Sequence, residues 1–230
     1  YDRAALDLTA EDKAKLEAEG RKPHWRFRLD GRAVAFDDLI KDGQTVNTSS
    51  MSDPVVIRED GSYLYTFTSV VDDIDMGVTH IIRGEDHVSN TGTQIEIFEA
   101  LGAPAPVFGH HNLLTDAEGQ GFSKRLGSLS LGQLRDDGYE PLAVAIMASI
   151  TGTSLPVEPY PDLDAIAEKL EFSMISHGSA RFDPAELETL NARIVHAMDF
   201  AAVKERLGDV GGLTEAAWLA LRGNISRLNQ

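Results

Sequence analysis

The feature that most constrains this chain is a strand, helix and strand pattern between residues 78 and 108. Residues 78–82 form a run of apolar and β-branched side chains, which is typical of a buried strand. Residues 91–101 then repeat apolar side chains at helical spacing, and Gly102 follows as a stop signal. A second short strand is predicted over residues 106–108. Such a unit needs parallel strands, because the helix carries the chain back across the sheet, so the sequence predicts an α/β fold.

Polar residues follow both predicted strands. Residues 83–86 come directly after the first strand, and residues 110–112 come after the second. In open parallel sheets, ligands bind beyond the carboxyl ends of the strands. We therefore expect a binding site where these two segments meet.

The rest of the chain shows weaker patterns. Upstream we expect helices over residues 4–19 and 37–41 and strands over residues 24–29, 55–57 and 63–71, the last because it is rich in aromatic and β-branched side chains. From about residue 128 the pattern is helical, with helices expected over residues 130–137, 141–150, 164–170, 183–198 and 214–221. The prolines within residues 151–162 predict a linker between two helical parts.

Composition limits the classes of partner. The 230 residues carry a formal net charge of −16, which repels polyanions at long range, so any nucleic-acid contact must rest on a local basic patch. The best patch alternates cations with aromatic side chains and contains Arg21, Lys22, Arg26 and Arg28, although an edge strand with one wet face explains it equally well. The absence of cysteine excludes disulfides and thiolate metal sites and fits a cytoplasmic protein. The longest apolar run, residues 142–150, is too short to span a bilayer.

A glycine-rich loop over residues 119–128 carries Ser123, Lys124 and Arg125. Glycines let backbone amides approach a ligand closely, and a serine beside two cations suits phosphate oxygens. The order of residues differs from that of a Walker A loop. On composition alone, a solvated surface turn is an equal alternative.

A more specific signal comes from four segments taken together, residues 65–73, 79–87, 108–114 and 122–125. In content, order and spacing they resemble the glutamyl-tRNA synthetases, which are class I aminoacyl-tRNA synthetases, and the likeness covers most of residues 54–195. The resemblance implies the second half of a Rossmann-type parallel sheet, followed by a helix-rich region that contacts the tRNA stem. It places the end of the acceptor-binding insertion in residues 1–53, half of the nucleotide-binding fold in residues 54–115, and a mobile loop with the helical region in residues 116–230.

The resemblance also assigns roles to single residues. Ser123, Lys124 and Arg125 match the mobile KMSKS-type loop, so they are expected to grip the ATP phosphates and to stabilise the charge that develops on the leaving pyrophosphate. Gly121 stands where that motif usually begins with a lysine. Leu114 matches the position whose backbone contacts adenine. ATP with Mg²⁺ is therefore the expected nucleotide.

The amino-acid substrate is assigned in the same way. Arg83 resembles the arginine that binds the glutamate side chain, and a guanidinium pairs with a carboxylate through two hydrogen bonds while it rejects neutral analogues. Tyr65 matches a tyrosine that holds the same amino acid through its hydroxyl group. The structural alternatives are that Arg83 pairs with Glu85 or Asp86 at the strand end, and that Tyr65 only packs within its strand.

The reaction that the resemblance implies has two steps. Glutamate attacks the α-phosphate of ATP, and the activated acyl group then passes to the terminal ribose of tRNA. The expected partners are tRNA, L-glutamate and ATP, for a cytoplasmic monomer without membrane contact, and the basic patch would meet the acceptor arm of the tRNA. Whether the tRNA is specific for glutamate alone or also for glutamine stays open.

The histidine motif of the family's first βα turn is absent from this sequence. We therefore expect the chain to be a middle portion of such an enzyme and to be inactive alone. Two alternatives stay open, a non-catalytic fragment or paralogue that binds glutamate or tRNA, and a metal-dependent hydrolase. The hydrolase would use the side chains of Asp72, Asp73, Asp75, His80, Asp86, His87, His110 and His111, but no pair has the helical spacing of a zinc protease, and no dedicated metal site is predicted.

Overall fold

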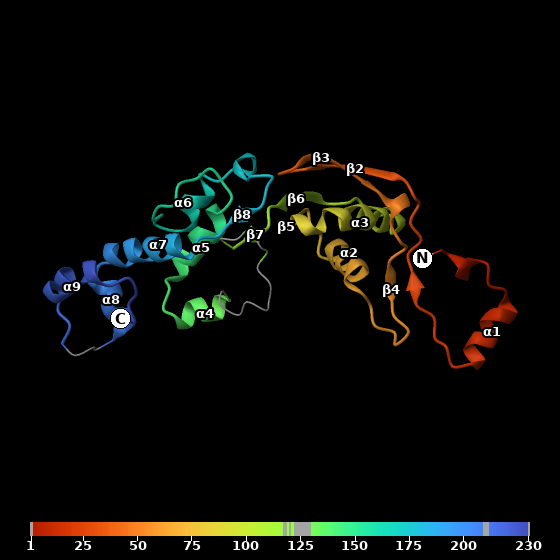
Figure 1. Cartoon of the computed structure of the whole chain (residues 1–230), viewed down its shortest axis with the longest axis horizontal. Coiled ribbons are helices and arrows are strands. Elements are labelled where there is room, and N and C mark those ends of the chain that lie inside the picture. Colours follow the sequence, from red (N-terminus) through yellow and green to blue (C-terminus); the bar gives the residue numbers. More distant parts are fainter. Residues whose placement is uncertain (1, 117–118, 120, 122–129, 209–211, 230) are drawn as a thin grey trace. The chain divides into compact units, whose positions relative to one another are not determined.

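The computed structural model describes residues 2–116, 119, 121, 130–208 and 212–229. The chain divides into two compact units, Tyr1–His111 (unit 1) and Asn112–Gln230 (unit 2), and each is described by itself. Figure 1 labels the elements of both units along the chain. Within the described residues, no helix has the length and apolar character needed to cross a membrane.

Unit 1 is built on a four-stranded sheet with the order β3-β2-β6-β5. Its strands are β2 (Ala33–Asp38), β3 (Asp42–Asn47), β5 (His80–Gly84) and β6 (Val107–His111). β5 and β6 are parallel and pair from His80 with Val107 to Gly84 with His111. β2 is parallel to β6 and forms an antiparallel hairpin with β3. The predicted parallel sheet is therefore confirmed, and the carboxyl ends of β5 and β6 lie side by side.

Helix α3 (Val88–Ala100) connects β5 to β6, and helix α2 (Tyr65–Asp75) packs beside it, as Figure 1 shows. Residues 91–98 of α3 are all buried, because the helix contacts α2 as well as the β2–β3 hairpin. Gly92 lies so close to the hairpin that a Cβ atom there would stand 2.6 Å from Cγ1 of Val46. Gly102, with φ at +75°, ends the helical run as predicted.

Two expectations for unit 1 are wrong. Residues 63–71 are not a strand, since helix α2 covers most of them; their β-branched side chains suit a strand locally, but Phe67, Val70 and Ile74 meet the core at helical spacing. Residues 37–41 are not a helix but the turn of the hairpin. There Asp38 accepts the backbone N–H groups of Ile40 and Lys41, which is the local bonding that aspartate offers in turns.

The remaining elements of unit 1 flank this sheet. They are η1 (Ala4–Leu6), α1 (Ala10–Ala18), β1 (Trp25–Arg26), η2 (Thr48–Ser50), β4 (Val55–Ile57) and η3 (Glu85–His87). The helix expected over residues 4–19 forms in two pieces, and the strand expected over residues 24–29 is shortened to β1, which pairs antiparallel with β4.

Unit 2 is mainly helical, as the sequence predicts. Its elements are β7 (Leu114–Thr115), α4 (Leu131–Asp136), α5 (Pro141–Ile150), α6 (Leu163–Ala167), η5 (Phe172–Met174), β8 (Ala180–Arg181), α7 (Pro184–Ala197), α8 (Phe200–Leu207), α9 (Glu215–Leu221) and η6 (Arg222–Asn224). Ser130, Asp183 and Thr214 each cap the helix that follows by accepting one of its backbone N–H groups. Helix α8 was not predicted, although Asp199 caps it in the same way.

Candidate functional site

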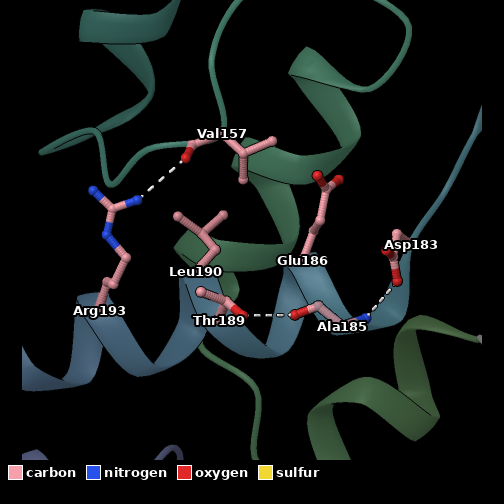
Figure 2. A pocket seen from close by; sticks show the side chains of 7 residues that line it. All are labelled: Val157, Asp183, Ala185, Glu186, Thr189, Leu190 and Arg193. Carbon is pink, nitrogen blue, oxygen red and sulfur yellow. Dashed lines mark hydrogen bonds between the residues drawn. The ribbon is translucent and has the colours of Figure 1, made fainter.

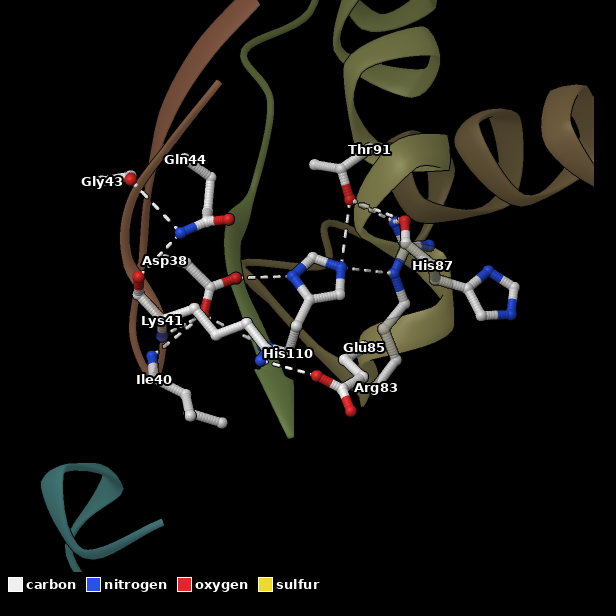
Figure 3. Close-up of polar contacts among 10 residues, drawn as sticks. All are labelled: Asp38, Ile40, Lys41, Gly43, Gln44, Arg83, Glu85, His87, Thr91 and His110. Carbon is white, nitrogen blue, oxygen red and sulfur yellow. Dashed lines mark hydrogen bonds and ion pairs between the residues drawn. The ribbon is translucent and has the colours of Figure 1, made fainter. Parts of the chain in front are cut away.

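The carboxyl ends of β5 and β6 bring together a group of polar side chains around Arg83. The guanidinium of Arg83 donates from Nε to Nε2 of His110 at 3.2 Å and from Nη2 to the hydroxyl of Thr91 at 2.7 Å. A longer contact of 3.5 Å joins Nη2 to the carbonyl oxygen of His87. Figure 3 shows this arrangement, with the imidazole of His110 between Arg83 and Asp38. We call Asp38, Arg83, Thr91 and His110 the Arg83 network.

His110 and Asp38 form the buried end of this network. Nδ1 of His110 lies 2.5 Å from Oδ2 of Asp38, and both side chains are fully buried. The other carboxylate oxygen of Asp38 accepts three backbone N–H groups, from Ile40, Lys41 and His110. Because arginine has no acceptor, its bond to Nε2 of His110 requires an unprotonated Nε2, and the ring hydrogen must then lie on Nδ1, facing Asp38.

Burial and neighbouring charges set the protonation of this pair. Burial lowers the pKa of His110, and the charges of Arg83 and His87 add to that effect against the opposing pull of Asp38. Burial raises the pKa of Asp38, but the hydrogen bonds from His110 and from the backbone outweigh it and hold the pKa below its ordinary value. The pair is therefore a neutral imidazole beside a carboxylate at neutral pH.

Arg83 has no carboxylate partner among the residues that the structure describes. Glu85 instead forms an ion pair with Lys41 at 2.6 Å, and Asp86 lies 3.9 Å from His87. The structural alternative in which Arg83 pairs with Glu85 or Asp86 is therefore not observed. Asp73 on α2 feels the charge of Arg83, because burial raises the pKa of Asp73 and Arg83 lowers it to a smaller extent.

Tyr65 lies at the first position of helix α2 and not in a strand, and it is 54% exposed. Its ring meets the imidazole of His87 edge to face, with 5.7 Å between centroids and an angle of 71°. Because Arg83 contacts the carbonyl oxygen of the same histidine, Tyr65 and Arg83 both contact His87. The interpretation of Tyr65 as packing within a strand is wrong.

Sequence reasoning missed two members of the Arg83 network. Thr91 was assigned only to the predicted helix, and Asp38 was placed in a short helix that does not form. The signal that could have located Asp38 is its place at the end of a segment in which the side chains alternate as in a strand, directly before a turn.

None of the other predicted site residues has a described contact with the Arg83 network. Ser123, Lys124 and Arg125 lie outside the described residues. Leu114 is partly buried in β7, which pairs in parallel with β8. The basic patch of Arg21, Lys22, Arg26 and Arg28 is exposed beside Trp25, and Arg26 also donates to the backbone oxygen of Asp53 at 2.6 Å.

Two further kinds of site, a metal site and a pocket, can be assessed in the described part of the chain. The described part of the chain contains no group of three or more histidine, aspartate or glutamate side chains placed to hold a metal ion. A pocket of about 290 Å³ lies along α7 in unit 2, as Figure 2 shows, and Arg193 donates to the carbonyl oxygen of Val157 at its edge. The lining consists of Val157, Asp183, Ala185, Glu186, Thr189, Leu190 and Arg193, none of which is a predicted site residue.

Comparison with known proteins gives a consistent result. The chain is 59% identical over 231 residues to glutamate–tRNA ligase 2 of Methylobacterium radiotolerans and 56% identical over 242 residues to glutamate–tRNA ligase 1 of Brucella ovis. These matches cover 99% and 100% of this chain but only 52% and 53% of those proteins, so the chain spans about half the length of the curated relatives it matches.

A solved structure matches at the level of the fold. The crystal structure of a glutamate tRNA ligase from Elizabethkingia meningosepticum, in complex with its amino acid, superposes with a TM-score of 0.80 at 25% identity and covers 97% of this chain and 50% of that chain. The family described as class I tRNA synthetases (E and Q), catalytic domain, matches residues 1–189. With most of its length inside that match, this chain belongs to the class I tRNA synthetases of the glutamate and glutamine type.

Proposed function

We propose that this chain supplies the amino-acid recognition side of a glutamate–tRNA ligase, which activates glutamate with ATP and transfers it to tRNA. Its relatives are named for that activity, and the family match supports the use of ATP. Arg83 is the proposed ligand of the glutamate side chain, and Tyr65 is the proposed second contact.

The proposal rests on one observation: the described hydrogen-bond partners of the Arg83 guanidinium are all neutral groups. A partly buried guanidinium at the carboxyl end of β5 contacts only neutral acceptors, which are His110, Thr91 and the backbone of His87. Three of its five N–H groups are used in this way, and the two on Nη1 have no partner among the described residues. A partly buried cation that has no hydrogen-bonded carboxylate among the described residues attracts an anionic ligand, so the carboxylate of glutamate fits this position better than the neutral amide of glutamine.

The rest of the reaction is assigned to residues on the basis of the family. Lys124, with Ser123 and Arg125, would stabilise the charge that builds on the pyrophosphate of ATP with its Mg²⁺, and the backbone at Leu114 would contact adenine. Arg83 would fix the substrate so that its α-carboxylate lies near the α-phosphate, which lowers the barrier through positioning and not through covalent catalysis.

Glutamate-dependent exchange of pyrophosphate into ATP, measured with tRNA present in the full-length enzyme that contains this chain, tests the proposal. Arg83→Ala should raise the KM for glutamate by about a hundredfold or more, because losing one partner of a desolvated charge pair costs roughly 2–5 kcal/mol. The KM for ATP should change little. Arg32→Ala is the matched control, since Arg32 is a partly exposed arginine of unit 1 that pairs with Glu99 and lies outside the site. An Arg83→Ala enzyme with wild-type glutamate KM would refute the assignment.

The same assay separates the non-catalytic alternative. Glutamate binding without any exchange in the full-length protein would favour a binding paralogue. The hydrolase alternative has no supporting observation among the described residues, and it is not proposed.

Contact with tRNA is proposed for the exposed patch of Arg21, Lys22, Arg26 and Arg28, and the protein is proposed to act as a cytoplasmic monomer. Replacing Arg21 and Lys22 together by glutamate should weaken tRNA binding and reduce its salt dependence, while the glutamate KM stays unchanged. Unaltered tRNA affinity would remove these residues from the interface.

A further inference from the structure

His110 and Asp38 are the part of the Arg83 network that cannot touch a substrate, because both side chains are fully buried. They come from distant parts of the chain, with Asp38 at the hairpin turn that ends β2 and His110 in β6, 72 residues later. Such a buried polar chain requires full satisfaction of its donors and acceptors. In the structure each has its partner, in the order backbone N–H groups, Asp38, His110, Arg83.

Each link in this chain fixes the next. One oxygen of Asp38 is occupied by three backbone N–H groups, so the other must receive the ring hydrogen on Nδ1 of His110. That tautomer leaves the lone pair of Nε2 to accept Nε–H of Arg83 at 3.2 Å, and the hydroxyl oxygen of Thr91 lies 3.0 Å from the same nitrogen. The hydroxyl of Thr91 accepts from Nη2 on the same edge of the guanidinium. With this edge fixed, Nη1 is the part of the group left for a ligand.

We infer that Asp38 and His110 are positioning residues that orient Arg83 for the carboxylate of the amino-acid substrate, by holding His110 in the neutral tautomer that accepts from Nε of Arg83. The inference rests on the proposed function, since it gives Arg83 its substrate. It assigns to the β2–β3 hairpin a direct role in amino-acid affinity.

The charges around His110 agree with this role. The titratable and charged groups that act on His110 are Asp38 on β2, Arg83 on β5 and His87 on η3. The rings of Phe36 and Phe108 also pack against it, each with 6.2 Å between its ring centroid and that of the imidazole. A proton on Nε2 would remove the acceptor and place a second positive charge against the guanidinium. Burial, and to a smaller extent Arg83 and His87, lower the pKa of His110, so this proton is disfavoured at neutral pH.

The decisive variant is Asp38→Asn in the full-length enzyme. The oxygen of the new amide stays with the three backbone N–H groups, so its NH₂ group faces Nδ1 of His110. Nδ1 must then accept, the ring hydrogen moves to Nε2, and it points at Nε–H of Arg83. In the pyrophosphate exchange assay, the KM for glutamate should rise about tenfold or more, as a displaced positioning group does, with the KM for ATP unchanged. His110→Phe, which keeps a ring but no acceptor, should give the same pattern.

Two control variants distinguish positioning from general damage to the fold. Glu96→Gln also converts a buried carboxylate of unit 1 into an amide, but Glu96 bonds Asp30 and Thr48 and not Arg83. It should lower the melting temperature without changing the glutamate KM. His110→Gln keeps an acceptor near the position of Nε2 and should therefore retain most of the glutamate affinity that His110→Phe loses.

The pH profile supplies a readout that a merely structural role would not move. As pH falls from histidine's ordinary pKa of 6.5 through the lowered pKa of His110, the wild-type glutamate KM should rise, and the His110→Gln profile should be flat. His87→Gln removes the other nearby imidazole and should keep the wild-type slope. A slope that disappears in His87→Gln and persists in His110→Gln would overturn the inference.

Arg83→Lys separates the failure of this inference from the failure of the proposed function. If Arg83→Lys raises the glutamate KM while Asp38→Asn and His110→Phe leave it unchanged, Arg83 binds the substrate but the buried pair does not position it. If Arg83→Lys itself leaves the glutamate KM unchanged, the proposed function is wrong. If all three variants raise it and Glu96→Gln does not, the inference is supported.

Discussion

Each unit contains a partly buried arginine that stacks near an aromatic ring, but the two arginines have different partners. Arg227 in unit 2 lies 4.2 Å above the ring of Tyr139 and forms an ion pair with Glu188. Arg83 in unit 1 lies 5.6 Å from the ring centre of Phe108 and contacts only neutral acceptors. An arginine whose charge is already neutralised serves the fold, whereas one held by neutral groups keeps its charge for a ligand.

The carboxylates follow the same division. Glu188 accepts from Arg227, Tyr139 and Ser226, and although burial raises its pKa, these hydrogen bonds bring it below the ordinary value. Asp38 has a lowered pKa too, but it acts on Arg83 only through the imidazole of His110. Placing a neutral ring between carboxylate and guanidinium orients the arginine without neutralising it. The contrast indicates that direct pairing stabilises unit 2, whereas indirect pairing leaves the charge of Arg83 available for the ligand proposed above.

The largest expected effect comes from replacing each arginine by methionine, which keeps the length of the side chain and removes the charge. Arg83→Met should reduce the kcat/KM for glutamate in pyrophosphate exchange by about a hundredfold or more, since the carboxylate of the substrate loses its charged partner. Its melting temperature should fall less than that of Arg227→Met, because no hydrogen-bonded carboxylate loses its partner and the hydroxyl of Thr91 stays beside Nε2 of His110. A large loss of stability with retained glutamate affinity would break the comparison.

Arg227→Met should give the opposite result. It leaves the partly buried Glu188 without its cation, and we expect a loss of about 2 kcal/mol in the free energy of unfolding, measured with denaturant on the full-length enzyme. The glutamate KM should stay at the wild-type value. The double variant Arg227→Met with Glu188→Met should recover part of the stability, because an apolar pair removes the unpaired charge.

Glycine substitutions sharpen the comparison at a smaller scale. Gly92→Ala places a Cβ atom 2.6 Å from Val46, so α3 and the hairpin that carries Asp38 must separate. A loss of about 1–2 kcal/mol in unfolding free energy is typical of such overpacking, and the glutamate KM should rise with it. Val46→Ala in the same chain should relieve both effects.

Gly138→Ala is the counterpart in unit 2. Gly138 has φ at +85°, and a Cβ atom there would meet the side chain of Asn229 at 2.4 Å. Because this glycine precedes Tyr139, the change should loosen the Arg227 cluster and lower stability, while the glutamate KM stays constant. A glutamate KM that responds equally to both glycine variants would show that the Arg83 network does not depend on hairpin packing.

Much of the fold could be predicted from the sequence because it depends on local signals. The strand, helix and strand unit, whose helix ends just before Gly102, and the helix starts at Ser130, Asp183 and Thr214 follow from patterns within a few residues. Helix α2 was misassigned because aromatic and β-branched side chains favour a strand locally, whereas packing of Phe67 and Val70 on the core decides for a helix.

The candidate site could be predicted only in part, because some of its contacts join residues that are far apart in the sequence. Arg83 and Tyr65 were identified by resemblance, and their convergence on His87 agrees with a shared site, although their roles stay proposals. The partners of Arg83 depend on a contact between Asp38 and His110 across 72 residues, which no local pattern encodes. Their chemistry could not be assigned until the sheet order placed β2 beside β6.

The smallest expected effect is a separation of the two regions by pH. Glu188 has a lowered pKa, so the stability it contributes is present above its ordinary value of 4.5 and is lost as pH falls through the lowered pKa. After solvent screening, the change should be about 0.5 kcal/mol or less.

His110 also has a lowered pKa, but it is a base that is neutral when folded. Its contribution is therefore present above the ordinary value of 6.5 and is lost as pH falls below that value. Denaturant unfolding of the full-length enzyme between pH 7 and 3 should show a loss of stability below pH 6.5 that His110→Gln removes and a loss below pH 4.5 that Glu188→Gln reduces. If Glu188→Gln flattens the upper slope instead, the neutral imidazole is not what distinguishes the arginine of unit 1 from that of unit 2.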